Sequence, residues 1–313
     1  MKYINAIIIA LLFSTEALAQ DFGNTIQQVK PIPEMLGVSE VRQGRVETFR
    51  YKAVVNDKMI TKHARVYLPY DYNKKDKRAR YNVVYLMHGG GDNSTSFFSD
   101  PRSPLSLIQV LDYLIANKEM DPVIVVTPTF YVDDENIGAN SMDNAIRMCR
   151  DFHIELRNHL IPAIEKNYNI LSGREHRAFG GFSMGSLCTW YQLAYGSDAV
   201  RNFIPLSGDL WVYDNDGKKY EPKMAAEWLN AQLSNAKNGK DIRVFAYTGT
   251  KDIAGTPERN FIEALTKHAP IFRYNVPDAN LHFSMKVGGV HYYGDINEYL
   301  FYALPLIWSH TKP

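Results

Sequence analysis

The sequence predicts an α/β domain with a mostly parallel central sheet and helices on both faces. Short apolar runs alternate with longer amphipathic segments along the 313 residues, which is the pattern of strands and helices that follow one another in α/β proteins. No internal repeat or low-complexity linker interrupts this alternation. The length suits one large domain of this class, although it also allows two small ones.

The N-terminal residues 1–19 have the composition of a signal peptide. Lys2 is followed by an apolar run over 4–13, and the small–x–small sequence 17–19 precedes Gln20. The apolar run is too short to span a bilayer, and no cysteine stands directly after the cleavage site to carry a lipid. We therefore expect export to the periplasm or the medium without a membrane anchor; an uncleaved buried helix is the alternative.

The segment 20–45 is polar, contains two prolines and is predicted to be an irregular lead-in to a single domain over 46–313. Alternating hydrophobicity predicts that 46–55 and 61–68 form a β-hairpin at a sheet edge. Apolar runs predict buried strands at 81–87, 123–127, 203–206, 242–247 and 283–287. Helical spacing of apolar residues predicts helices at 105–115, 143–168 with a kink at Pro162, 223–235, 258–268 and 296–308.

The chain is organised around the stretch 177–187. An apolar run leads to Gly181, Ser183 and Gly185, and a helical pattern begins at Met184. A serine at the turn between a strand and a helix stands exposed, because the flanking glycines relieve steric clashes there. Gly-x-Ser-x-Gly arises by chance in about one chain in ten of this length, so a plain glycine-rich turn is the alternative. The strand before and the helix after it favour a nucleophilic serine.

A serine nucleophile needs a histidine base and a carboxylate that orients the histidine. His291 is the best placed, because it follows a predicted strand and two glycines and precedes the last helix. The other histidines after the serine are His268, His282 and His310. Asp252 is the preferred acid, because it follows the strand before that of His291. The alternative acids are Asp209, Asp278 and Asp295.

The predicted oxyanion hole combines two backbone N–H groups. Met184, the first residue of the helix after the serine, supplies one of them, and the positive end of the helix dipole adds to its effect. The other comes from the glycine-rich loop 88–91, in which Gly90 is our candidate. The alternative is that these glycines only form a tight turn.

Charge and aromatic content narrow the range of partners. The 35 Lys+Arg nearly balance the 34 Asp+Glu, which argues against nucleic acid or an anionic membrane as the main partner. The 20 Tyr, 15 Phe and 4 Trp leave room for a surface that stacks on sugar or aromatic ligands. Cys149 and Cys188 fall in predicted helices. We expect buried thiols, although a disulfide also fits an exported protein.

These motifs resemble those of the esterase D-type α/β-hydrolases, and most of all the feruloyl and acetylxylan esterases of carbohydrate esterase family 1. The resemblance covers about 46–308 and rests on the motifs at 88–91, 181–185, 249–252 and 289–291. It implies the α/β-hydrolase fold and hydrolysis of hydroxycinnamoyl or acetyl esters on xylan-type plant polysaccharides. It also implies that no metal or organic cofactor is needed.

The resemblance extends to the substrate side of the site. Segments 207–211 and 291–294 resemble the feruloyl esterase modules of plant-wall-degrading bacteria, with tyrosines where many relatives carry tryptophans. We expect Trp211, Tyr292 and Asp209 to contact the substrate, although Trp211 also fits ordinary packing. Two alternative functions stay open: another acyl hydrolase or acyltransferase on the same scaffold, and a carbohydrate-binding protein without catalysis.

Overall fold

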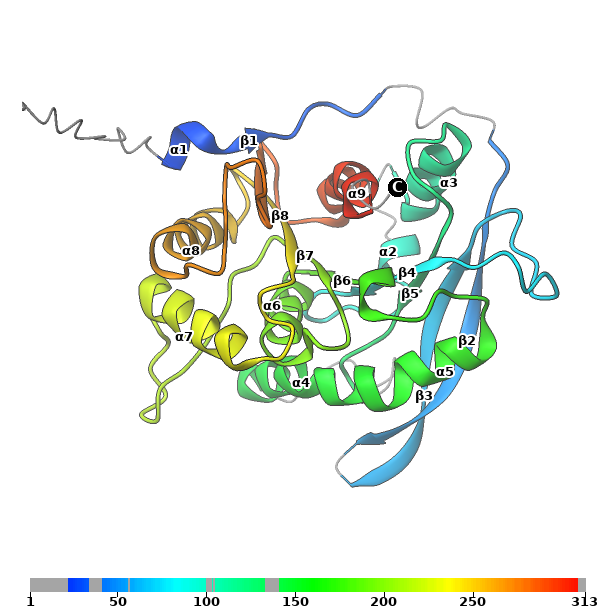
Figure 1. Ribbon diagram of the computed structural model, residues 1–313, viewed down its shortest axis with the longest axis horizontal. Helices are drawn as coiled ribbons and strands as arrows, with labels where there is room; N and C mark the ends of the chain where they lie inside the picture. The colour runs from blue at the N-terminus through cyan, green and yellow to red at the C-terminus, as the bar shows by residue number, and fades with distance from the viewer. Residues whose placement is uncertain are drawn as a thin grey trace, which may run out of the picture.

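The computed structural model describes residues 22–33, 41–55, 57–99, 103, 105–132 and 141–308. In this part of the chain nine strands form one sheet in the order β1-β9-β8-β7-β6-β4-β5-β3-β2 (Figure 1). Only the pairs β2–β3 and β3–β5 of this sheet are antiparallel, so the predicted class is confirmed. The strands are β1 Gln27–Gln28, β2 Arg45–Val55, β3 Lys58–Leu68, β4 Asn82–Met87, β5 Val123–Thr127, β6 Arg177–Phe182, β7 Asn202–Leu206, β8 Arg243–Gly249 and β9 Leu281–Lys286.

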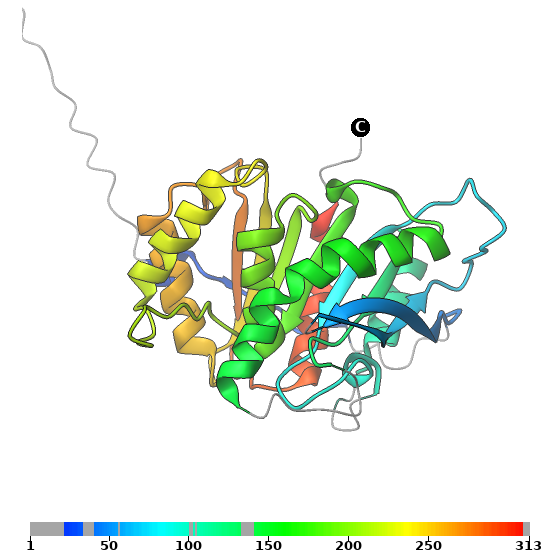
Figure 2. The ribbon, with the colours of Figure 1, turned by 90° about the horizontal axis from the view of Figure 1, so that it is seen from below.

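Helices cover both faces of the sheet, because successive strand residues point to opposite sides and both sets are apolar. One face packs against α2 (Ser96–Ser99), α3 (Leu107–Ala116) and α9 (Tyr293–Ile307). The other packs against α4 (Met142–Glu155), α5 (Ile161–Asn167), α6 (Met184–Gly196), α7 (Pro222–Asn235) and α8 (Gly255–His268). Figure 2 views the molecule from the side of α4 and α5, which lie in front of the sheet.

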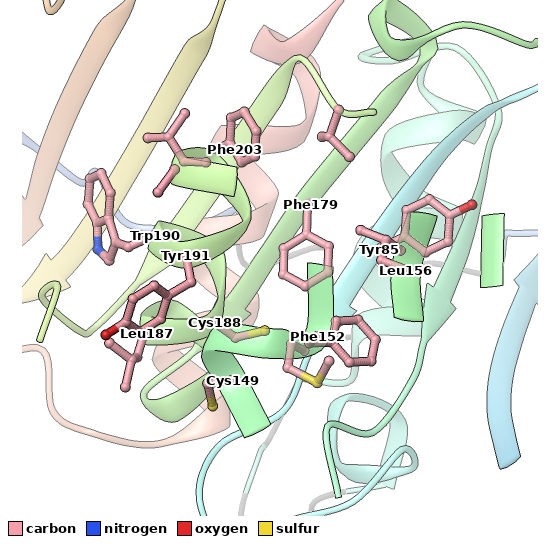
Figure 3. Packing of buried hydrophobic residues seen from close by; sticks show 14 of the residues in the cluster. Tyr85, Cys149, Phe152, Leu156, Phe179, Leu187, Cys188, Trp190, Tyr191 and Phe203 are labelled. Atoms are coloured by element: carbon pink, nitrogen blue, oxygen red, sulfur yellow. The ribbon is translucent and has the colours of Figure 1, made fainter. Parts of the chain in front are cut away.

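The core beneath the predicted serine elbow lies between β6 and α6. Figure 3 shows Phe179 of β6 and Trp190 of α6 within this cluster, together with Cys149 and Cys188. Both cysteines are buried free thiols, and Cys149 Sγ donates to the Met184 carbonyl oxygen at 3.4 Å. Burial of each large apolar side chain contributes about 1.5–3 kcal/mol. The start of α6 is therefore held on well-packed layers.

The predicted irregular lead-in contains two short elements. Phe22–Thr25 forms α1, and β1 pairs in parallel with β9, with Gln27 opposite Ser284. The ring of Phe22 stacks on Phe283 with ring centroids 6.2 Å apart. A strand of two residues has no hydrophobic period, which is why the sequence did not indicate it. Residues 1–21, which include the predicted signal peptide, and residues 34–40 lie outside the described part of the chain.

The predicted helix over 143–168 is two helices joined by a π-helical turn. This turn covers Leu156–Leu160, and the Ile161 N–H donates to the Leu156 carbonyl five residues earlier. Pro162 has no N–H, and in a regular α-helix its ring would clash with the carbonyl four residues earlier. One extra residue in the turn avoids that clash. The irregularity therefore precedes Pro162, whereas the sequence predicted a kink at it.

Candidate active site

Ser183 stands at the apex of a strained turn between β6 and α6. Its backbone has φ 57° and ψ −114°, a conformation that side chains disfavour. The turn passes so close to β4 that a Cβ on Gly185 would lie 2.1 Å from the Met87 carbonyl oxygen. The Ser183 N–H donates to the Leu206 carbonyl at 3.0 Å, which holds the turn against β7. The sequence GFSMG therefore forms the serine elbow that it predicts, with Ser183 half-buried at its apex.

Three side chains from three different loops form one hydrogen-bonded chain at this elbow. His291 Nε2 lies 2.9 Å from Ser183 Oγ, and His291 Nδ1 lies 2.7 Å from Asp252 Oδ1. With the proton on Nδ1, the imidazole donates to the carboxylate and its Nε2 is able to accept the serine proton. The Asp252 side chain is fully buried, whereas His291 keeps 21% of its side chain exposed. The structure thus brings together the three residues singled out in the sequence.

The alternative acids have other partners. Asp209 accepts from Trp211 Nε1 at 2.7 Å, and Asp278 pairs with Arg273. Asp295 is buried at the start of α9, where it accepts from Lys286 Nζ at 2.6 Å and from the Val290 N–H. Because Val290 precedes the histidine, Asp295 holds the His291 loop in place. That supporting role was not apparent from the sequence, where Asp295 was only another possible acid.

The alternative histidines lie elsewhere. His282 stacks on Phe245 within the sheet, with ring centroids 4.9 Å apart, and His268 ends α8. His310 falls outside the described residues. Of the candidate histidines among the described residues, the structure places His291 against the serine hydroxyl.

The loop after β4 presents its backbone toward the start of α6. The N–H of Gly89 donates to Tyr293 OH at 3.2 Å, and that of Gly91 donates to Tyr131 OH at 2.9 Å. Between them, the N–H of Gly90 has no hydrogen-bond partner among the described residues. A Cβ on Gly90 would lie 3.0 Å from Met184 Cγ, so the two candidate oxyanion-hole residues are neighbours.

A buried polar network supports this loop from behind. His88 Nδ1 lies 2.7 Å from the Gly89 carbonyl, and its Nε2 lies 2.8 Å from Thr129 Oγ1. The Thr129 carbonyl accepts from Lys62 Nζ at 2.9 Å. Lys62 in turn pairs with Glu155 at 2.8 Å, and both side chains are buried. The carbonyl of Gly89 and the N–H of Gly90 belong to one planar peptide unit. His88 therefore fixes the direction of the Gly90 N–H.

We expect Lys62→Met to lower the free energy of unfolding by about 3–5 kcal/mol, because it leaves the Glu155 carboxylate buried without its cation. Urea unfolding followed by circular dichroism measures the change. Lys267→Met is the matched control, since Lys267 is 58% exposed and pairs with Glu263 one helical turn away. Such surface pairs contribute about 0.3–0.5 kcal/mol. Equal effects of the two substitutions would contradict the prediction.

A pocket of about 210 Å³ opens beside Ser183. Met184 and Leu187 of α6 contribute apolar surface to it, and further residues come from the segment after β7, from 253–257 at the start of α8 and from the His291 loop. The remaining lining residues are Ser207, Gly208, Asp209, Trp211, Lys219, Ile253, Ala254, Pro257 and His291. The surface that lines this pocket is mostly apolar, which suits a ligand with a hydrophobic body.

The three residues predicted to contact substrate differ in position. Trp211 and Asp209 line the pocket, and Lys219 Nζ lies 4.8 Å from the centre of the Trp211 ring and 2.9 Å from Asp209 Oδ2. One face of the indole is therefore occupied by an ammonium group. Tyr292 is not among the pocket residues, because its ring packs over Gly294 at the start of α9. The expectation of a substrate contact from Tyr292 is thus not supported by its position.

No group of three or more His, Cys, Asp or Glu side chains among the described residues is arranged to hold a metal ion. None of the helices in the described ranges combines the length and the apolar character that crossing a membrane requires.

The sheet order and the Ser183–His291–Asp252 contacts define the class of this protein, an α/β-hydrolase fold with the geometry of a serine esterase. The family described as "Putative esterase" matches residues 58–304, and the chain belongs to this esterase family. Within it, the chain is similar to feruloyl esterase modules of carbohydrate esterase family 1, as its motifs indicated.

Solved structures and curated relatives agree with this assignment. The feruloyl esterase module of Clostridium thermocellum, solved with sinapinate, is 34% identical, with a TM-score of 0.73 over 90% of this chain and 94% of that one. The ferulic acid esterase of Anaeromyces mucronatus, at 20% identity and a TM-score of 0.70 over 92% of this chain and all of that one, shares the fold.

The curated relatives are much longer proteins. Endo-1,4-beta-xylanase Y of Acetivibrio thermocellus is 35% identical over a match of 290 residues that covers 89% of this chain but 24% of that protein. The endo-1,4-beta-xylanase/feruloyl esterase of Xylanibacter ruminicola is 34% identical over 152 residues, 48% of this chain and 20% of that protein. The chain therefore spans only about a quarter or less of the length of these relatives.

Proposed function

We propose that the protein hydrolyses feruloyl-type hydroxycinnamoyl esters on xylan-type plant polysaccharides. The observation that carries this proposal is the largely apolar pocket of about 210 Å³ that opens directly beside Ser183 and includes Trp211. An acetyl group would leave most of such a pocket empty, whereas a planar phenolic ring fills it and buries apolar surface. The names of the relatives, a feruloyl esterase module and xylanases, support the same substrate class.

The proposed mechanism has two steps. As Ser183 Oγ attacks the ester carbonyl, its proton passes to His291 Nε2, and Asp252 stabilises the imidazolium. The N–H groups of Met184 and Gly90 stabilise the oxyanion. The imidazolium then gives its proton to the leaving sugar oxygen, which leaves an acyl-serine. Water, deprotonated by the same histidine, attacks this acyl-serine, and the returning proton restores the serine hydroxyl while the carboxylic acid departs.

The proposal extends to where the reaction takes place. The composition of residues 1–19 predicts a cleavable signal peptide. Polysaccharides are too large to enter a cell, so an enzyme that acts on them has to be exported. We therefore propose that the protein works in the periplasm or outside the cell. Activity recovered in the culture medium or periplasmic fraction of an expressing bacterium, and lost from both when residues 1–19 are deleted, tests this.

A release assay tests the substrate class. Purified protein is incubated with methyl ferulate, with feruloylated arabinoxylan and with acetylated xylan, and the released acids are quantified by chromatography. We expect ferulate release to exceed acetate release in kcat/KM by about tenfold or more, because binding energy from the ring helps to place the carbonyl over Ser183. A preference for acetylated xylan would instead support the acetyl esterase alternative.

The Trp211→Ala variant tests the wall of the pocket. Stacking or edge contact with an aromatic ring contributes on the order of 1 kcal/mol, in addition to the apolar surface buried. We therefore expect kcat/KM for methyl ferulate to fall by about tenfold, while that for 4-nitrophenyl acetate stays nearly unchanged. An equal fall for both substrates would show that Trp211 only supports the scaffold, and the feruloyl proposal would lose its physical basis.

A further inference from the structure

Glu258 is a buried carboxyl group that the proposed mechanism does not use. It lies in the first turn of α8, six residues after Asp252, and none of its side chain is exposed. Its Oε2 accepts a hydrogen bond from the Gly208 N–H at 3.0 Å. No lysine, arginine or histidine among the described residues forms an ion pair with it. A carboxyl group buried in this way is uncommon and calls for a physical explanation.

Gly208, whose N–H group Glu258 holds, lies against the serine elbow. The Gly208 carbonyl accepts from Ser186 Oγ at 2.7 Å and from Trp190 Nε1 at 2.9 Å. A Cβ on Gly208 would lie 2.8 Å from the Ser183 carbonyl oxygen, so this loop touches the nucleophile's own backbone. Glu258 therefore ties the loop after β7 to α8, while Ser186 and Trp190 tie the same loop to α6.

This loop needs such support because its backbone is strained. Ser207 has a φ of 54°, in the left-handed region that residues with a side chain rarely adopt. Its N–H donates to the Tyr247 carbonyl at 2.8 Å. Asp209 and Trp211, which line the pocket, follow within four residues. A shift of the Gly208 peptide would therefore move the pocket wall relative to Ser183.

The surroundings of Glu258 favour its uncharged form. Burial raises the pKa of Glu258 well above its usual value, and Asp252 and Asp209 raise this pKa further, while hydrogen bonds from the Gly208 N–H and the Thr248 hydroxyl lower it without offsetting burial. From α9, Tyr299 interacts with both Glu258 and Asp252. A carboxyl group that is buried without a cation, in the field of other carboxylates, ionises only at a large cost in free energy. Because Glu258 is fully buried and pairs with no cation among the described residues, its carboxyl group keeps its proton.

We propose that Glu258 is a positioning residue that, as an uncharged carboxylic acid, holds the pocket wall at 208–211 and the Asp252 loop in fixed relation to Ser183. This inference rests on the proposed function for the roles of Ser183 and Asp252. The hydrogen bond from the Gly208 N–H to Glu258 fixes the position of the pocket wall. Because Glu258 carries no charge, it does not perturb the Asp252–His291 pair.

Stability as a function of pH tests the uncharged state without reference to activity. If the folded protein keeps the Glu258 proton and the unfolded chain releases it, each pH unit above the unfolded pKa of about 4.3 lowers the wild-type folding constant by about tenfold through this group. Glu258→Gln has no such proton. We therefore expect its folding constant, relative to wild type, to rise by about tenfold per pH unit from pH 5 to 7, until Glu258 ionises in the folded state.

The matched control is Glu263→Gln on the same helix, where Glu263 is partly exposed and pairs with Lys267. Its stability relative to wild type should not rise with pH. A flat ratio for Glu258→Gln as well would mean that Glu258 is ionised in the folded protein, and it would overturn the proposal. This arm uses urea unfolding alone, so it stands even if the protein proves to have another substrate.

Kinetics test the positioning role. Glu258→Gln keeps an oxygen acceptor for Gly208, so kcat/KM for methyl ferulate should stay within about threefold of wild type, with the same acidic limb in its pH profile. Glu258→Ala removes the acceptor and should lose about tenfold or more, mainly through KM. If Glu258→Ala folds and keeps wild-type kinetics, the residue has no positioning role. If it does not fold, a shifted acidic limb or a large loss of kcat/KM in Glu258→Gln would likewise overturn the proposal.

Discussion

The Ser183→Ala variant is expected to lose on the order of 10³-fold or more in kcat for methyl ferulate while it remains folded. The Ser183 hydroxyl is the only group removed, and its oxygen is the atom that lies 2.9 Å from His291 Nε2. Without it no acyl-serine forms, and only direct attack by water on a bound ester is left. The oxyanion hole and substrate binding still provide part of the rate enhancement, which sets the residual activity.

Rapid kinetics and urea unfolding together check this expectation. The free energy of unfolding should change by much less than the barrier to catalysis, since an alanine fits the same turn. Ser234→Ala is the control, because Ser234 is an exposed residue of α7 remote from the pocket residues. A folded Ser183→Ala protein with near-normal turnover would exclude Ser183 as the nucleophile and with it the proposed mechanism.

The second large effect is expected for Asp252→Asn, at about 10³–10⁴-fold in kcat. Asp252 Oδ1 accepts from His291 Nδ1 at 2.7 Å and from the Ala254 N–H at the same distance. An asparagine amide carries no charge, and an orientation that turns its NH2 group toward His291 Nδ1 donates to that nitrogen and cannot accept its proton. The histidine proton then favours Nε2, where it blocks transfer from Ser183, and the imidazolium loses its counter-charge.

Asp209→Asn is the matched control, because Asp209 also follows a strand and also lies beside the pocket. Its carboxylate bonds to Trp211 and Lys219, whereas the Nδ1 of His291 bonds to Asp252. We expect the effect of Asp209→Asn on kcat to be at least about tenfold smaller than that of Asp252→Asn, with the larger part in KM. The reverse order of the two variants would assign the orienting acid to Asp209.

Local patterns predicted most of the fold. Strands such as Val123–Thr127 and Asn202–Leu206 are buried over their whole length, and a buried strand is recognised by its uninterrupted apolar run. The serine elbow could also be predicted from the sequence, because only glycine fits at 181 and 185. A Cβ at these positions would come as close as 2.1 Å to backbone atoms. Elements without a period, such as the two-residue β1, were missed for the same reason.

The sequence by itself determined the order of the elements, the class of the fold, the serine elbow and a short choice of histidines and carboxylates. These depend on spacing along the chain, where side-chain period and glycine placement act locally. The tertiary structure decided which candidates meet. It placed Asp252, and neither Asp209 nor Asp295, against His291, and it left Tyr292 out of the residues that line the pocket.

Tertiary structure also decided the supporting polar contacts. Lys62, Glu155 and Glu258 are residue types that usually lie at the surface, so their burial had no signal in the sequence. Lys62 and Glu155 are buried because they pair across β3 and α4. Glu258 is buried because α8 packs its first turn against Gly208. Contacts between residues distant in the chain follow from how the layers pack, which no local pattern encodes.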